Sequence, residues 1–524
     1  MKKIIYALFA VASLVSCSSD ELNQSPTNGL STSTALQSKS NVGMILTGAY
    51  DQTGHYYYLT IGQIALDDMG DDIMLSNGAF GFSPYKWNQY TYDYTQYARI
   101  NDGWWSSYCS YLWRKAYMAI DQCNLIIENA DKLPEGCDDY LAQAYGLRGW
   151  NFLNLYHLFC PAYLNKTLGG DNGKGLFLRL ASASADKSTD VDRSDLGTSM
   201  KQIISDLTYA YEHCSSTSNY YINKRSSALF LARVYLEMGN NTEAAKYAEI
   251  AAGNTFDGSN LMSQDEYQSG FMTANTEWLW GFKFDSESTN IYASIPSFYH
   301  VATAMDAQSG FGTANYGKQV PGDKIDDRVK YLSGNGVDYL VGYGTIRIAK
   351  SFTELFKKNG NGIWTDCRAL FPFYVDSKDG YITAKFSNRS TLGVADYPMA
   401  RIAEAYLIEA EAKFKQGAAA DGLKVLNALQ VKRGGNVSTE INIDEIWKER
   451  RRELYGEGFA LTDLKRLNLP LHREGEDHWS STLDLPADSP RMMFPIPDDE
   501  LDYNPYYKNS TTDYNKGQND YWAR

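Results

Sequence analysis

The residues between Phe82 and Tyr94 carry side chains suited to binding a sugar. Aromatic rings alternate there with amides and a lysine, and the stretch has no helical periodicity. An aromatic ring can cover the apolar C–H face of a pyranose, while amides and hydroxyls hydrogen-bond to its rim. The predicted ligand contacts are Tyr85, Trp87, Asn88, Tyr90 and Tyr92. The alternative is that Trp87 only anchors this loop to the core.

Two pairs of adjacent carboxylates, Asp67-Asp68 and Asp71-Asp72, precede this segment. A glycoside hydrolase holds two carboxylates about 5 to 10 Å apart across a cleft, and adjacency in the sequence does not establish that geometry. We expect these four acids to be solvated or to cap helices. A ligand or calcium site and a catalytic pair are the alternatives.

Motifs for covalent or metal-dependent catalysis are absent from the sequence. None of its six histidines lies in an HExxH or other metal-ligand spacing, and there is neither a GxSxG elbow nor a phosphate-binding glycine loop. Its seven cysteines form no CxxC pair, so those after Cys17 are expected to be buried as small hydrophobic residues. A net charge of −14 argues against binding to nucleic acid. The sequence predicts no catalytic residue, metal ligand or cofactor, with a structural calcium ion left open.

The N-terminus has the features of an export signal. Two lysines precede an apolar run from Ile4 to Val15, which is too short to span a bilayer. The run leads into Leu-Val-Ser-Cys ending at Cys17, which is similar to the bacterial lipobox, so we expect cleavage before Cys17 and lipid attachment to it. Loss of the two lysines takes the net charge from −14 to −16. The alternative is an ordinary secretory leader in which Cys17 is incidental.

Helical periodicity dominates both halves of the chain. Helices are predicted at Trp104–Asn129, Asp138–Phe159, Leu196–Cys214, Arg225–Met238, Glu243–Ala252, Met399–Gln416, Ala419–Arg433 and Ile443–Tyr455. Small residues and Tyr235 around Gly239 have the spacing of a tetratricopeptide repeat, and the chain around Gly417 repeats it more weakly. A single repeat cannot bury its own apolar face, so we expect several degenerate helical hairpins.

Between Gly253 and Pro398 no long helical pattern persists. Short runs in this region are predicted as strands, at Glu277–Phe284, Thr345–Ala349 and Tyr381–Phe386. The sequence therefore predicts a mainly α fold, in which degenerate tetratricopeptide-type hairpins carry an irregular, loop-rich region with small β elements.

Six blocks of the sequence occur in the order that one known family shows. They are Trp105–Asn124, Gly146–Tyr156, Arg193–Leu207, Arg401–Glu411, Glu449–Arg466 and Phe494–Pro505. Together these blocks resemble the SusD/RagB family, the surface lipoproteins of nutrient-uptake systems in Bacteroidetes, and the resemblance spans nearly the whole chain. The dense charges at 449–453 are expected to form intramolecular salt bridges, and a partner surface is the alternative.

The resemblance implies a division of the chain into five parts. They are a lipoprotein signal peptide at 1–16, a lipidated flexible tether at 17–40, an N-terminal SusD-like helical part at 41–252, an irregular loop-rich insertion at 253–398 and a C-terminal helical part at 399–524. Asp20 and Glu21, directly behind Cys17, look like the signal that sends such lipoproteins to the outer face of the outer membrane.

The resemblance also implies a function. It predicts a glycan-binding lipoprotein that captures oligo- or polysaccharide and delivers it to a SusC-like TonB-dependent transporter in the outer membrane. A later loop would supply the opposing wall of the ligand site, so Tyr292, Phe298 and Tyr299 are predicted as further ligand contacts. A RagB-like peptide-binding protein of the same kind of importer is the alternative. From other classes, the alternatives are a surface glycoside hydrolase and a repeat protein that only docks the transporter.

Overall fold

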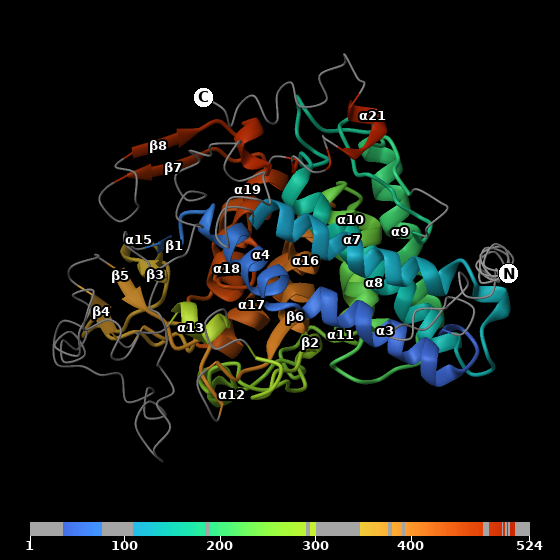
Figure 1. The fold of residues 1–524 in the computed structure, drawn as a ribbon. Helices are drawn as coiled ribbons and strands as arrows, with labels where there is room; N and C mark the ends of the chain where they lie inside the picture. Colours follow the sequence, from blue (N-terminus) through green and yellow to red (C-terminus); the bar gives the residue numbers. More distant parts are fainter. Residues whose placement is uncertain are drawn as a thin grey trace, which may run out of the picture.

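The computed structural model describes most of the chain. The described residues are 35–75, 108–183, 189–289, 294–299, 346–371, 373–375, 380–389, 393–474, 482–494, 496–497, 500 and 503–508. Most of them are helical, and the helices form the right and centre of the molecule in Figure 1. The mainly α fold predicted from the sequence is confirmed.

The longer helices are α3 (Lys39–Gly54), α4 (Tyr56–Asp68), α7 (Tyr108–Ile127), α8 (Asp138–Phe159), α9 (Leu196–His213), α10 (Lys224–Glu237), α11 (Asn241–Ala252), α16 (Ile402–Lys415), α17 (Ala419–Arg433), α18 (Ile443–Leu454) and α19 (Ala460–Arg466). The short ones are η1 (Ala130–Lys132), α12 (Gln264–Gln268), α13 (Ile295–Tyr299), α15 (Lys350–Thr353), η6 (Pro490–Met492) and α21 (Pro505–Lys508). The strands are β1 (Ile73–Leu75), β2 (Trp278–Phe282), β3 (Ile346–Ala349), β4 (Phe373–Val375), β5 (Gly380–Ile382), β6 (Tyr397–Arg401), β7 (Leu471–Glu474) and β8 (Thr482–Leu485).

The helices pack as neighbours along the chain. α7 packs against α8, α8 against α9, α10 against α11, and α11 against α16, which pairs with α17. In the hairpin of α10 and α11, Ala232 and Ala244 are fully buried, and these small residues let the two helices approach closely. Gly239 makes the turn with a φ of +76°, a conformation that a residue with a side chain rarely adopts. The helical hairpin predicted around Gly239 is present.

Local sequence signals fix where these helices begin and end. Asp195 caps α9 by accepting a hydrogen bond from the Thr198 amide at 2.6 Å. Asn223 forms a capping box with Ser226 at the start of α10. Helix α11 ends at Gly253 with a φ of +72°, which is the usual left-handed cap. The hairpins are therefore encoded by caps as well as by apolar periodicity.

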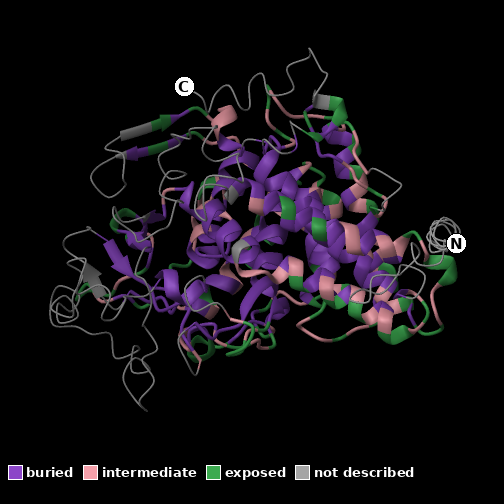
Figure 2. Cartoon of the chain, in the orientation of Figure 1, coloured by how far each residue is buried: buried purple, intermediate pink, exposed green. Residues whose placement is uncertain are grey.

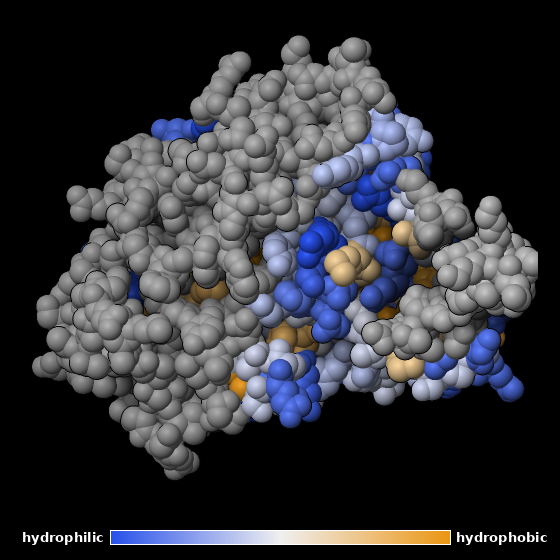
Figure 3. All heavy atoms as spheres, viewed as in Figure 1, coloured by the Kyte–Doolittle hydropathy of each residue, from blue (hydrophilic) through white to orange (hydrophobic). Residues whose placement is uncertain are grey.

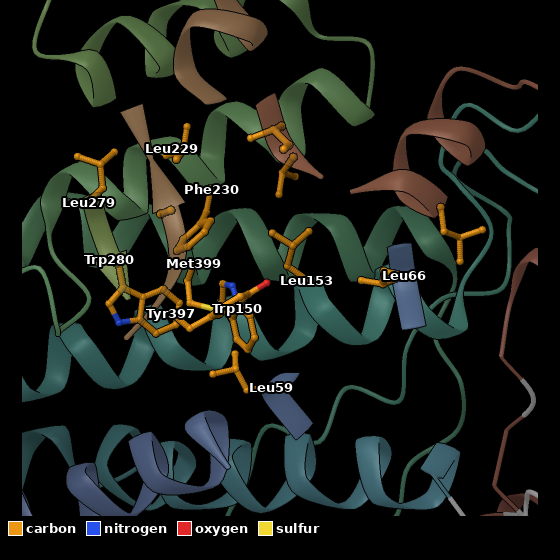
Figure 4. Packing of buried hydrophobic residues seen from close by; sticks show 14 of the residues in the cluster. Leu59, Leu66, Trp150, Leu153, Leu229, Phe230, Leu279, Trp280, Tyr397 and Met399 are labelled. Atoms are coloured by element: carbon orange, nitrogen blue, oxygen red, sulfur yellow. The ribbon is translucent and has the colours of Figure 1, made fainter. Parts of the chain in front are cut away.

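The core continues from the helices into the pair of strands β2 and β6. Trp280 of β2 packs edge-on against Trp150 of α8 at 5.5 Å and against Phe230 of α10 at 5.8 Å between ring centroids, as Figure 4 shows. Trp280 also pairs with Ala400 of β6 in an antiparallel register. The prediction that the helix begins at Met399 is wrong, because Met399 still belongs to this strand pair and α16 begins at Ile402.

A four-stranded antiparallel sheet in the order β1-β3-β5-β4 lies at one edge of the helical body, at the left of Figure 1, where β1 contacts α4. Its two inner strands β3 and β5 come from the region predicted to hold small β elements. β7 and β8 form a separate hairpin. Sheet and helices share one contiguous set of buried residues, drawn in purple in Figure 2.

Hydrophilic residues lie mainly on the described surface, and the cysteines lie in the interior. In Figure 3 hydrophilic side chains cover most of the described surface, with a few hydrophobic ones among them. The six cysteines after Cys17 are all buried and unbridged, as predicted. Within the ranges that the structure describes, no helix has both the length and the apolar character that crossing a membrane requires.

Candidate functional site

Most residues of the predicted ligand site lie outside the described residues. They are Tyr85, Trp87, Asn88, Tyr90, Tyr92 and Tyr292, and the same holds for the predicted lipid-bearing Cys17. Their roles stay predictions. The described chain nevertheless fixes where the segments that carry them begin and end.

The segment 76–107, which carries five of these residues, and the segment 300–345, which carries none, border paired positions of the four-stranded sheet. Leu75 ends β1, directly before residues 76–107, and Ile346 begins β3, directly after residues 300–345. In the antiparallel pair of β1 and β3, Leu75 lies opposite Ile346. Helix α13, which follows residues 290–293, packs against β3. Segments far apart in the sequence therefore attach to one end of this sheet, which we call the β1–β3 corner.

Phe298 and Tyr299 are core residues in the structure. Their exposed fractions are 3% and 1%, and all five residues of α13 are buried. The ring of Tyr299 packs against Phe386 with 5.5 Å between centroids. The expectation of ligand contact at these two positions is therefore not met, because α13 turns both rings into the protein and leaves no face for a sugar.

A buried ion cluster is centred on Glu453 of α18. Arg401 donates to Glu453 Oε1 at 2.9 Å, Arg433 donates to both carboxylate oxygens at 3.0 and 3.1 Å, and Arg368 donates to Oε2 at 3.2 Å. The side chains of these four residues are at most 1% exposed. The intramolecular salt bridges predicted for the charged block are confirmed.

Further charges extend this cluster. Its carboxylates are Glu277, Asp366, Glu449, Glu453 and Glu457, and its cations are Arg368, Lys385, Arg401, Arg433 and Arg452. Burial acts to raise the pKa of Glu453, yet the surrounding arginines hold it well below its usual range. Burial lowers the pKa of Lys385 to about 8, although its salt bridge to Glu457 at 2.7 Å opposes the shift. Each buried charge thus has a partner, as burial requires.

Asp67 ties the N-terminal half to the C-terminal half. Its carboxylate accepts hydrogen bonds from the backbone amides of Gly458, Phe459 and Ala460 at 2.8, 2.9 and 3.1 Å, and so caps α19 from the end of α4. Burial raises the pKa of Asp67 to about 7, although the amides favour its charged form. The capping role expected of this acid is confirmed.

Two of the other three acids near Asp67 are not solvated either, while Asp71 is half-buried. Asp68 and Asp72 are buried, so the solvated alternative is wrong for them as it is for Asp67. Asp72 accepts a hydrogen bond from Nε of Arg451 at 2.9 Å, which links β1 to α18. Among the residues that the structure describes, no three His, Cys, Asp or Glu side chains are placed to hold a metal ion. A structural calcium ion stays a prediction.

The N-terminal blocks of the sequence also meet through a buried charge. Arg148 of α8 donates to both oxygens of Asp206 at 2.7 and 2.8 Å and to Asn124 Oδ1 at 2.9 Å. These three residues come from three different blocks that resembled one family. Arg148 and Asp206 thus form a buried bidentate ion pair, and Asn124 accepts a further hydrogen bond from Arg148. Such a pair stabilises the fold, which explains why these residue types occur in the blocks that resemble the family.

Sequence comparison with known families gives two matches at opposite ends of the chain. Residues 22–236 match a SusD-like family described as starch-binding and associating with the outer membrane, and residues 374–524 match the SusD family. The chain belongs to the SusD family. Among curated proteins, no sequence matches this SusD-family protein.

Solved structures of SusD proteins share the fold. A SusD superfamily protein from Bacteroides thetaiotaomicron superposes with a TM-score of 0.69 at 22% identity, covering 89% of this chain and 98% of that one. One from Bacteroides vulgatus gives 0.70 at 20% identity, covering 89% and 99%. A SusD-like carbohydrate binding protein from Bacteroides vulgatus gives 0.63 at 21% identity, covering 85% and 89%. At these identities the likeness establishes the fold of the family.

Proposed function

We propose that this SusD-family protein captures glycans at the outer membrane and delivers them to a SusC-like TonB-dependent transporter. The N-terminal family match, described as starch-binding and outer-membrane associated, supports the glycan and the location. The carbohydrate binding protein from Bacteroides vulgatus with the same fold supports the ligand class. The transporter supplies the energy of uptake, so the proposal needs no catalytic group in this chain.

The ligand site is proposed at the β1–β3 corner. The observation that carries this placement is that Leu75, the last described residue before 76–107, pairs with Ile346 of β3, and that α13, which follows residues 290–293, also packs against β3. Trp87 and its aromatic and amide neighbours at 85, 88, 90 and 92 would stack on and hydrogen-bond to the sugar. Tyr292, shortly before α13, would contact the ligand from the other side.

The test is isothermal titration of the soluble form starting at Ser18 against starch, plant and host polysaccharides and a peptide digest. We expect one glycan class to bind, and Trp87→Ala to weaken that binding at least tenfold, about 1.4 kcal/mol. Tyr221→Ala, at a tyrosine 48% exposed, is the matched control and should bind as the wild type does. Binding of peptides alone would place the protein in the RagB-like branch and contradict the glycan proposal.

Two further experiments test the anchor and the partner. Cys17→Ser removes the thiol that would carry lipid, so the protein should move from the membrane fraction to the soluble fraction. Co-purification with a SusC-like transporter should persist in Trp87→Ala, because stacking on a sugar and docking on the transporter use different contacts. Loss of both activities together in Trp87→Ala would contradict the separate roles.

A further inference from the structure

A cleft of about 480 Å³ lies between α7, the loop around Arg179 and the C-terminal residues around Glu500. Its size falls in the range of small-molecule sites, about 300 to 1,000 Å³. Figure 1 shows α21, next to this cleft, and the sheet of β1 and β3 on different sides of the helical body. The cleft is therefore separate from the β1–β3 corner, and we call it the α7 cleft.

Buried hydrogen bonds fix one wall of the α7 cleft in place. The Glu500 carboxylate accepts hydrogen bonds from the indole Nε1 of Trp113 at 3.1 Å, from the Arg179 guanidinium at 2.8 Å and from the side-chain amide of Asn504 at 2.7 Å. The Arg179 guanidinium lies over the ring of Tyr117, 4.9 Å from its centroid. These contacts hold together three stretches of chain that are distant in the sequence, so the wall is formed before a ligand arrives.

Other groups on the lining are available to a ligand. Tyr503 is 76% exposed and Met118 is 39% exposed, which gives a ring and an apolar surface at the rim. Asp121 accepts from the Ala183 amide at 2.7 Å through Oδ1, and its Oδ2 has no hydrogen bond to any described residue. The cleft thus combines a ring and an apolar surface with one open acceptor.

The charged groups on the lining nearly balance each other. Arg179 is already neutralised by Glu500 and by Asp190, the latter at 3.2 Å. The whole lining holds three carboxylates, Asp121, Asp190 and Glu500, and two guanidinium groups, Arg114 and Arg179, so its formal charge is only −1. An anion would meet three carboxylates on the lining, and a cation would meet two guanidinium groups. A hydroxyl group, by contrast, can donate to Asp121 Oδ2 without bringing a charge into the cleft.

We propose that the α7 cleft binds a neutral oligosaccharide, as a second site apart from residues 85–92. Tyr503 would stack on a sugar ring, and a hydroxyl of that sugar would donate to Asp121. No motif in the sequence marks this site, because its lining comes from α7, the loop after α8 and the C-terminal residues. The inference does not depend on the glycan site proposed at the β1–β3 corner.

The test uses the same soluble form carrying Trp87→Ala, which removes the other proposed site. Maltoheptaose, cellohexaose and mannohexaose are titrated calorimetrically, with trilysine as a cationic probe. At least one sugar should bind, and Tyr503→Ala and Asp121→Asn should each weaken its binding at least tenfold. Asn at 121 keeps an oxygen for the Ala183 amide while replacing the open acceptor by a donor.

Tyr506→Ala is the matched control, since Tyr506 is 50% exposed on α21 and does not line the cleft. It should leave the titration unchanged. Sugar binding that disappears entirely with Trp87→Ala would overturn the second site while supporting the first. Absence of any Tyr503-dependent sugar binding up to the solubility of the probes would also overturn it. Binding of trilysine in place of sugars would assign the cleft to a cationic ligand and overturn the carbohydrate assignment.

Discussion

Replacement of Glu453 by glutamine removes the charge on which three buried arginines converge. Arg401, Arg433 and Arg368 all donate to this carboxylate, and none of the four side chains is more than 1% exposed. Glutamine has nearly the same shape, but it is neutral and turns an amide group toward the guanidinium groups. Removing one partner of a buried ion pair costs about 3–5 kcal/mol. Since whole proteins are stable by about 5–15 kcal/mol, Glu453→Gln should remove a large share of the stability.

Urea unfolding followed by tryptophan fluorescence measures this loss, because Trp278 and Trp280 are buried and report on the core. We expect a lower midpoint at an unchanged slope, which indicates lost stability in the same folded state. Asp444→Asn, on the same helix α18, breaks an ion pair with Lys448 at 2.6 Å in which Asp444 is 60% exposed. Such an exposed pair contributes about 0–1 kcal/mol. A loss from Glu453→Gln no larger than that from Asp444→Asn would refute the reasoning.

Two further predictions concern the loss of stability at acid pH and the replacement of glycines by alanine. Burial alone would raise the pKa of Glu411, but Arg466 at 2.7 Å helps to lower it from 4.5 to about 2. Its contribution, about 3 kcal/mol, is present above pH 4.5 and is lost as the pH falls toward 2, so the urea midpoint should drop steeply across that window; a flat profile would contradict this. Gly456 and Gly417 both have positive φ, +79° and +83°, but a methyl group at 456 would collide with Phe386 while one at 417 meets nothing within 4 Å. Gly417→Ala should cost about 1 kcal/mol and Gly456→Ala at least about 2 kcal/mol in the same urea assay, and equal losses would argue against the collision.

Helices with a regular apolar pattern could be predicted from the sequence. The bounds predicted for α8 and α17 are those of the structure. The prediction missed α3, and it missed α4, where every residue from Tyr58 to Asp68 is buried and no polar face creates a period. It also missed β6, since only the pairing of Ala400 with Trp280, more than a hundred residues away, makes this stretch a strand. Long-range partners decided α4 and β6.

The predicted site shows the same limit. Aromatic residues at 298 and 299 have the composition of a binding surface, but the packing of α13 buries them. Composition alone does not distinguish a ring that faces a ligand from one that faces the core. The α7 cleft is the opposite case, because its parts look unremarkable in the sequence and meet only in the folded chain. The sequence could predict which residue types a binding site needs, but it could not predict which of those residues are exposed in the fold.

The motifs that reveal the family hold the scaffold together. Arg148 with Asp206, and Glu453 with Arg401, lie in these motifs and form buried ion pairs. Losing one partner of such a pair costs several kcal/mol, while an exposed substitution usually changes stability by about 0.5 kcal/mol or less. The motifs are therefore tied to the fold and carry no information about the ligand. If Trp87 lies on an exposed loop, as proposed, Trp87→Ala will leave the scaffold intact, and that is why this variant can separate ligand binding from folding.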